Sequence, residues 1–424
     1  MRAAAEAQTR RSVWAWALYD WGNSAFATAV AASLFPVLLK GWWGSGLPAT
    51  RTTFLLGLVS AAVALAVAVL APLLGAVADG LGLRRAFLGA FAALGAAATA
   101  ALALPGAGEW QPALALYGLA ALGFGAANVF YDALLTSVAR PGDYERVSAF
   151  GYALGYLGGG LFFALVTGAV LAHGPLGLGS PEAAARWALA ATGLWWAAFT
   201  VPVLRAVREG CPHGRAGAAR ALAEGWARLR GTFREVRRLR PVAWFLLAYW
   251  LYIDGVNTVF RMATDYGAAL GLAPRHLLLA LLLTQFVSFP AALAFGRIGA
   301  RWGPRAGIRL GLGVYALATV GAFFITSAWH FYALAATVGL VQGGVQALSR
   351  AWYARLVPAG CAAEFFGFYN VVGRFAAILG PLAVGVTAEL TGSHRLALLV
   401  LLAFFAGGAL LLGRVPPAAG ALRR

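Results

Sequence analysis

Apolar stretches of about 20 residues recur through almost the whole chain, and they constrain its fold more than any other feature. An α-helix needs about 20 apolar residues to cross about 30 Å of hydrocarbon, whereas strands of a membrane barrel alternate over about 10 residues. The composition agrees, because 61% of the residues are hydrophobic and only 11% are charged, against about 25% charged in soluble domains. The sequence therefore predicts an all-α integral membrane protein.

Twelve transmembrane helices are predicted, in two pseudo-symmetric halves of six. Their approximate ranges are 13–39, 52–77, 86–104, 112–139, 147–172, 183–207, 242–270, 275–298, 306–326, 330–356, 365–390 and 395–412. We expect an N-terminal half at 1–208, an Arg-rich cytoplasmic linker at 209–241, a C-terminal half at 242–414 and a cytoplasmic tail at 415–424. Within the linker, residues 218–239 could form an amphipathic helix on anionic headgroups or a solvated charged segment.

The net charge of +18 could indicate nucleic-acid binding, but the basic residues lie in alternate loops. Of the 33 basic residues, 25 lie in the even-numbered connections and the two tails, and five lie in the odd-numbered connections. The positive-inside rule then places both termini in the cytoplasm. We therefore expect the lipid bilayer as the partner, no nucleic acid, and a bacterial-type inner (plasma) membrane location with the first helix retained rather than cleaved.

One polar motif occurs near the start of each half. Asp20 and Asn23 in the first predicted helix, and Asp254 and Asn257 in the seventh, belong to the pattern Asp-x-x-Asn-(Ser/Thr)-x-Phe. On a helix this spacing places the polar groups on one stripe. A charge at the centre of a membrane helix costs roughly 2.5–3.5 kcal/mol, so such residues are expected to face a cavity. A duplicated six-helix unit is typical of secondary transporters whose site lies between the halves.

Further polar residues form stripes inside other predicted helices, and at an offset of 218 residues Asp132 corresponds to Arg350, so equivalent helices present opposite charges. We predict that the stripes line a central cavity between the halves. The predicted substrate-binding or gating residues are Asp20, Asn23, Asn128, Tyr131, Asp132, Asp254, Asn257, Arg261, Gln346, Arg350, Asn370 and Arg374.

Three interpretations of these charges stay open. Acid from one half and arginine from the other could form a gate of ion pairs that break as the halves rock. Alternatively, Arg350 or Arg374 could bind the carboxylate of a zwitterion while an acid binds its ammonium group. The third interpretation is a set of buried structural pairs without a transport role.

The loop between the second and third predicted helices carries Gly75, Asp79, Gly82, Arg84 and Arg85 in the pattern G-x-x-x-D-x-x-G-x-R-R. This pattern resembles the signature loop of the major facilitator superfamily. The resemblance implies that Asp79 and the arginines clamp the cytoplasmic helix ends in one state of a transport cycle. In the second half an alanine stands at the position equivalent to Asp79, so only one copy of the clamp is expected.

A narrower resemblance is to the vacuole-effluxer branch of that superfamily, the bacterial relatives of the autophagy-related vacuolar amino-acid exporter. It rests on Trp16–Phe26 with Phe35-Pro36, Phe245–Asn257, Gln346–Arg350, and Glu364–Asn370 continuing to Gly380-Pro381. The resemblance implies a secondary active or facilitative transporter that moves a small polar solute, such as an amino acid or similar zwitterion, by alternating access. The alternatives are a proton-coupled multidrug exporter of the same fold and, more remotely, a transport-inactive receptor or scaffold.

Other chemistry finds little support in the sequence. The only lysine is Lys40, in an outer loop, so no nucleotide-binding Gly-x-x-x-x-Gly-Lys-(Ser/Thr) loop exists. The five histidines show no metal-ligand spacing and no Ser-His-Asp arrangement. We therefore expect no enzyme activity, cofactor or metal, and a monomer that works by facilitated diffusion or ion coupling. If protons are the coupling ion, Asp20, Asp132 and Asp254 are the candidate carriers.

Overall fold

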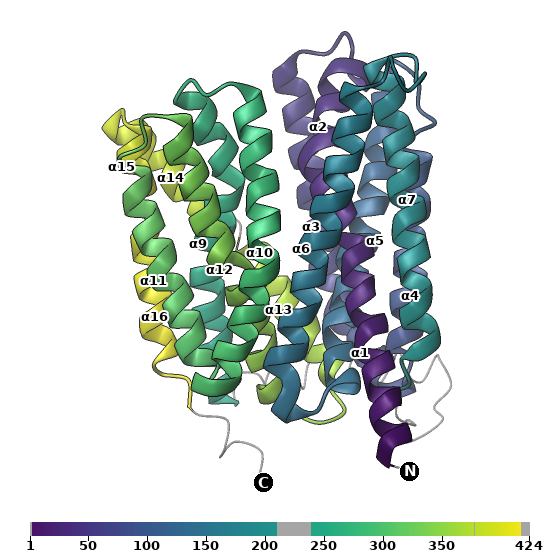
Figure 1. Cartoon of the computed structure of the whole chain (residues 1–424), viewed down its shortest axis with the longest axis vertical. Helices are drawn as coiled ribbons and strands as arrows, with labels where there is room; N and C mark the ends of the chain where they lie inside the picture. Colours follow the sequence, from purple (N-terminus) through teal and green to yellow (C-terminus); the bar gives the residue numbers. More distant parts are fainter. Residues whose placement is uncertain (1, 210–238, 377, 417–424) are drawn as a thin grey trace.

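A computed structural model describes residues 2–209, 239–376 and 378–416. Within these ranges the chain is helical, without strands, and forms a bundle of two halves that stand side by side (Figure 1). Helix α1 begins and α16 ends at the same end of the bundle, which we call the terminal side. Residues 218–238 of the predicted amphipathic linker helix and residues 417–424 of the predicted C-terminal tail lie outside the described residues.

The first half contains six membrane-crossing segments. Its elements are α1 (Arg2–Ala25), η1 (Phe26–Leu34), α2 (Phe35–Leu38), η2 (Leu39–Trp43), α3 (Ala49–Leu81), α4 (Arg84–Ala101), α5 (Trp110–Val138), η3 (Pro141–Asp143), α6 (Tyr144–Leu171) and α7 (Pro181–Ala206). The first four of these elements follow one another directly and form one long segment, so the N-terminal apolar stretch is a single crossing.

The second half repeats this plan. Its elements are α9 (Arg240–Ala269), α10 (Pro274–Trp302), α11 (Pro304–Ala322), α12 (Ala328–Leu356), α13 (Ala362–Phe375), α14 (Leu379–Thr391), α15 (His394–Leu398) and α16 (Leu401–Leu412). Ten segments of the described chain are long and apolar enough to cross a membrane. Helices α4 and α11 have 18 and 19 residues, or about 27–29 Å at 1.5 Å per residue, and they complete the twelve.

The eleventh predicted crossing is present as one apolar span, Ala362–Thr391, but the prediction of one continuous helix there is wrong. Helix α13 ends at Phe375 and α14 begins at Leu379. A proline inside a helix removes one backbone hydrogen bond, and its ring crowds the carbonyl four residues earlier. Pro381, in the first turn of α14, therefore explains why the helix breaks just before it.

The first crossing is also irregular, because η1 and η2 are π-helices that flank the short α2. Pro36 lies in α2, two residues after η1 ends. A π-helix is wider than an α-helix, is rare, and often marks a functional site. Here η1 supplies part of the wall of the central cavity described below.

The two halves approach most closely on the terminal side, where α3 packs on α13 and α6 packs on α10. Small residues allow these close approaches. A Cβ atom added at Gly75 of α3 would lie 2.5 Å from the carbonyl oxygen of Ala363, and one added at Gly296 of α10 would lie 2.6 Å from the Cβ of Ala149. Close helix crossings at glycine are typical of membrane bundles.

The contact at Gly75 predicts an effect of size on stability. Gly75→Val should destabilise the protein by about 1–3 kcal/mol, because the side chain must displace backbone atoms of the other half. Thermal unfolding in detergent measures the change. Gly57→Val is the matched control on the same helix, since a Cβ at Gly57 meets nothing within 4 Å. Equal stability of the two variants would contradict the described packing.

Candidate functional site

A cavity of about 730 Å³ lies between the two halves, and residues from both halves line it. Helices α1, η1, α3, α5 and α6 of the first half and α9, α10, α12 and α13 of the second contribute side chains. Ten of the twelve predicted site residues lie on its wall: Asp20, Asn23, Asn128, Tyr131, Asp132, Asn257, Arg261, Gln346, Arg350 and Asn370. The predicted stripes therefore do converge in space, although their roles in transport stay predictions.

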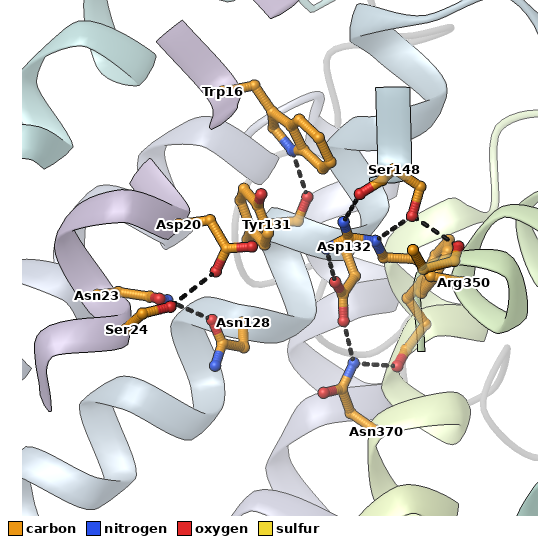
Figure 2. A network of polar contacts seen from close by, with 12 residues as sticks. Trp16, Asp20, Asn23, Ser24, Asn128, Tyr131, Asp132, Ser148, Arg350 and Asn370 are labelled. Carbon is orange, nitrogen blue, oxygen red and sulfur yellow. Dashed lines mark hydrogen bonds and ion pairs between the residues drawn. The ribbon is translucent and has the colours of Figure 1, made fainter. Parts of the chain in front are cut away.

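The floor of the cavity, toward the terminal side, is an ion pair between the halves. Arg350 of α12 donates from Nη1 to Oδ1 of Asp132 on α5 at 3.0 Å. Asn370 of α13 donates from Nδ2 to the other carboxylate oxygen of Asp132, also at 3.0 Å. Both oxygens of one carboxylate are thus bound by groups from the opposite half (Figure 2).

Arg350 is almost completely buried, with 1% of its surface exposed. Its Nε donates to the Ser148 hydroxyl and its Nη2 donates to the Ser148 carbonyl, both at 2.9 Å, so α6 of the first half also holds it. Its guanidinium lies over three aromatic rings of the first half, at 4.8 Å from the Trp16 ring centre, 5.2 Å from Tyr131 and 4.3 Å from Tyr152. Desolvated cation–π contacts of this kind stabilise an arginine without neutralising it.

Asp20 occupies a different environment on the same wall. Its carboxylate faces the cavity and accepts a long hydrogen bond from the Ser24 hydroxyl at 3.4 Å (Figure 2). One turn along α1, Asn23 donates to Asn128 of α5 at 2.6 Å. The Tyr131 hydroxyl is buried and has no hydrogen-bond partner among the described residues. This part of the wall therefore offers polar groups with capacity for further hydrogen bonds.

Asp254, the counterpart of Asp20 in the second half, points elsewhere. Its carboxylate accepts hydrogen bonds from the backbone N–H groups of Leu379 at 3.1 Å and Gly380 at 2.9 Å. These N–H groups are at the start of α14 and have no acceptor within the helix itself. A negative charge at this position also interacts favourably with the helix dipole. Asp254 is 1% exposed and does not line the central cavity. It caps the second part of the broken helix.

Arg374 is the other predicted residue that lies off the cavity wall. Its guanidinium lies directly against Gly125 of α5, where any larger residue would collide with it. Its buried Nε has no hydrogen-bond partner among the described residues. On α9, the predicted stripe splits in the same way, because Asn257 and Arg261 reach the cavity whereas Thr258 bonds to Asp254.

Two further layers join the halves on the terminal side of the floor. Glu145 of α6 accepts two hydrogen bonds from Arg355 of α12, both at 2.7 Å. Asp79, at the end of α3, accepts from the backbone N–H groups of Ala363 at 3.1 Å and Glu364 at 3.0 Å, in the first turn of α13. The signature loop therefore does contact the opposite half, at a helix N-terminus.

Within the signature loop, Arg84 pairs with Asp79 through its Nε. Gly82 has a φ of +65° and ends α3 in a left-handed conformation that favours glycine. Glu209 accepts from the backbone N–H groups of Arg84 at 2.9 Å and Arg85 at 2.7 Å, at the start of α4. Burial raises the pKa of the Glu209 carboxyl, and these two N–H groups oppose that shift.

The cavity opens toward the side opposite the termini. At its floor Asp132 and Arg350 are buried, whereas Ser60 and Arg261, on the walls nearer the other end, are exposed. The ribbons of the two halves also diverge in that direction (Figure 1). Among the described residues, no group of three His, Cys, Asp or Glu side chains could hold a metal ion.

Sequence reasoning missed several residues of this arrangement. Tyr152 and Ser148 hold Arg350, and Glu145 pairs with Arg355, but none of them was predicted to act in the site. Glu145 lies just before the helix predicted at 147–172 and Ser148 lies in its first turn, where polar residues are ordinary. Only their partners, about 200 residues away in the chain, distinguish them.

Comparisons with known proteins agree with this architecture. The model of the family described as "Vacuole effluxer Atg22 like" matches residues 43–142 and 141–421. The chain is 38% identical over 408 residues to the uncharacterized MFS-type transporter YxiO of Bacillus subtilis (strain 168), covering 95% of this chain and 94% of that one. It is 29% identical over 289 residues to autophagy-related protein 22 of Yarrowia lipolytica, covering 61% of this chain and 48% of that one. The chain thus spans about half the length of this fungal relative.

A solved structure shows the same fold at low sequence identity. The human organic anion transporter MFSD10 superposes with a TM-score of 0.74 at 19% identity, covering 95% of this chain and 99% of that one. At this identity the similarity concerns the fold alone.

The different positions of Asp20 and Asp254 predict different effects of the same substitution. Asp254→Ala should destabilise the protein by about 0.5–2 kcal/mol, because it leaves two N–H groups at the start of α14 without their acceptor. Asp20→Ala should change stability by less than about 0.5 kcal/mol, since it removes a cavity-facing group with one weak contact. Thermal unfolding of both variants in detergent gives the comparison. A larger loss for Asp20→Ala would overturn the assigned positions.

Proposed function

This chain belongs to the Atg22-like vacuole effluxer family, within the major facilitator superfamily of membrane transporters, and is not an enzyme. From this premise we propose that it moves a small polar solute, an amino acid or a similar zwitterion, by alternating access. The observation that carries the proposal is the cavity of about 730 Å³ between the halves, which is lined by the Asp20 carboxylate from one half and the Arg261 guanidinium from the other.

Arg261 and Asp20 are the groups that we propose for recognition. Arg261 is exposed to the cavity, and no acidic side chain within the described residues lies within 4 Å of its guanidinium. Asp20, from the first half, accepts a long hydrogen bond from Ser24, and among the described ion pairs none includes it. An arginine can bind a carboxylate through two parallel hydrogen bonds, and a carboxylate can bind an ammonium group. Asn23, Asn257 and Gln346 supply amide groups beside them.

Arg350 fits the role of a gate better than that of a ligand in this state. Its donors are already engaged by Asp132 and by Ser148, and its guanidinium is covered by aromatic rings. A substrate would have to displace these bonds in order to reach it. We therefore assign the Asp132–Arg350 pair to closure of the floor, with Glu145–Arg355 and the Asp79 contacts behind it.

The direction of the opening follows from the proposed orientation. With both termini in the cytoplasm, as the distribution of arginines favours, the cavity of this state faces outward. The three terminal-side layers must then break, and new contacts must form at the outer ends, before the substrate reaches the cytoplasmic side.

We also propose that protons drive the cycle and that Asp20 carries them. Of the three predicted carriers, it is the one that has neither an arginine nor a helix N-terminus as its partner.

A ligand screen tests the substrate class directly. The purified protein is heated in the presence of amino acids, small peptides, sugars or hydrophobic cations, and ligands that stabilise it are tested for uptake into proteoliposomes. Zwitterionic amino acids should raise the unfolding temperature and be transported. Stabilisation by hydrophobic cations alone would instead favour the multidrug exporter, and stabilisation without any flux would favour a receptor.

Arg261→Gln should weaken binding of the zwitterion identified in this way. Loss of a charged hydrogen-bond donor costs about 1.5–3 kcal/mol, so the Kd should rise roughly 10- to 150-fold. Titration of the thermal shift or calorimetry provides the Kd. Arg275→Gln is the matched control, because Arg275 is exposed at the same end of the second half but lies outside the cavity lining. An unchanged Kd for Arg261→Gln would remove Arg261 from the site.

Asp20→Asn should separate substrate exchange from proton coupling. The variant keeps the shape of the side chain but cannot take up a proton, and it binds an ammonium group more weakly. At saturating substrate it should therefore retain exchange of labelled for unlabelled substrate. It should lose accumulation driven by an imposed pH gradient. Both are measured in proteoliposomes, with Asp143→Asn, an exposed residue between α5 and α6, as the control. Wild-type flux that does not change with the imposed pH gradient would contradict the proposal that protons drive the cycle.

A further inference from the structure

A second polar cavity, separate from the central one, lies on the terminal side at the boundary between the halves. It has a volume of about 520 Å³, and its walls are Arg146 and Phe150 of α6 and Leu293, Arg297 and Arg301 of α10. We call it the seam groove. None of its residues lines the central cavity, so the transport site does not account for it.

The seam groove has a charged end and an apolar end. On α6, Phe150 lies one helical turn farther from the terminal side than Arg146, and on α10, Leu293 lies one turn farther than Arg297. Arg301 lies one more turn toward the terminal end of α10, since residues four apart share a helix face. Three guanidinium groups therefore sit at the end of the groove where the two helices leave the apolar part of the bundle.

Among the described residues, no acidic side chain forms an ion pair with these arginines. All three are exposed, and the described ion pairs, Arg84–Asp79, Arg350–Asp132 and Arg355–Glu145, do not involve them. Three like charges around one groove repel one another unless an anion joins them. A cluster of this kind has the positive charge needed to bind an anion.

Two exposed tryptophans beside the seam groove indicate that the groove lies at the depth of the membrane interface. Trp302, next to Arg301, is 69% exposed, and Trp14 is 54% exposed while it packs edge-on against Phe150 at 4.7 Å between ring centres. Tryptophan collects at the boundary between headgroups and acyl chains. An occupant of the seam groove would thus have its anionic part at headgroup depth and its apolar part beside Phe150 and Leu293.

We propose that the seam groove binds the phosphate of an anionic phospholipid, with an acyl chain along Phe150 and Leu293. The apolar end of the groove favours a lipid over a free phosphate ion, which would leave that end empty. Because α6 and α10 belong to opposite halves and are in close contact at Ala149 and Gly296, the bound lipid bridges the halves. It stabilises the state in which the terminal side is closed.

Thermal unfolding in detergent, with added lipid, tests the proposal on the whole protein. Phosphatidylglycerol should stabilise the wild-type protein in a saturable way, whereas phosphatidylcholine with the same chains and inorganic phosphate should not. In Arg146→Gln/Arg297→Gln, which removes one arginine from each wall, the half-saturating phosphatidylglycerol concentration should rise roughly thirtyfold, at about 1 kcal/mol per basic residue. Arg205→Gln/Arg240→Gln, with the same change of charge on exposed terminal-side arginines elsewhere, should behave as wild type.

Three results would overturn the site. They are an equal loss in both double variants, equal stabilisation by phosphatidylcholine, and equal stabilisation by inorganic phosphate.

A second measurement needs no variant. Wild-type protein is irradiated with phosphatidylglycerol that carries a photoreactive acyl chain, and the labelled peptides are mapped. Labelling should fall around Phe150 and Leu293 and be competed by phosphatidylglycerol but not by phosphatidylcholine, and labelling spread evenly over the lipid-facing helices would contradict the proposal.

Discussion

The arrangement of the two halves depends on the energy required to keep ionised side chains inside a membrane protein. An isolated guanidinium or carboxylate away from water costs several kcal/mol, and only close partners with good geometry offset this cost. Arg350 and Asp132 come from different halves, so each is satisfied only while the halves meet. Ser148 and Asn370 complete the hydrogen bonds of the pair. In the proposed transport cycle, the presence or absence of this contact would distinguish two states of the whole molecule.

The internal duplication provides a symmetric scaffold but not symmetric chemistry. The motif that contains Asp20 in the first half contains Asp254 in the second. Asp20 lies beside α6, which is continuous, and faces the cavity. Asp254 lies beside the break between α13 and α14 and accepts hydrogen bonds from the first N–H groups of α14. Helix α14 can start where it does because an acid is available to cap it. One copy of the motif thus caps a helix, and the other faces the central cavity.

Closure of the terminal side is divided among contacts of modest individual strength. The Glu145–Arg355 pair is partly exposed, since 29% of the arginine side chain is accessible, and ion pairs in such positions contribute little each. The Asp79 carboxylate binds two backbone N–H groups at the start of α13. Several moderate bonds between rigid halves can be exchanged for an equivalent set at the other end, which one very strong contact would prevent. The lipid that we propose for the seam groove would act at this same boundary between the halves.

The class of protein, the number of crossings and the duplication follow from the sequence alone, and so does a set of twelve site residues of which ten line the cavity. These features follow from the length of hydrocarbon a helix must cross and from the 3.6-residue period that puts polar groups on one face, and both can be read along a single helix. Only the tertiary structure decided that Asp254 caps α14 and that Arg374 packs on Gly125. It also decided that Glu145 meets Arg355 and that the cavity opens away from the termini. A helical stripe shows which residues share a face but not what lies opposite, because the partner is set by helices more than 100 residues away in the chain.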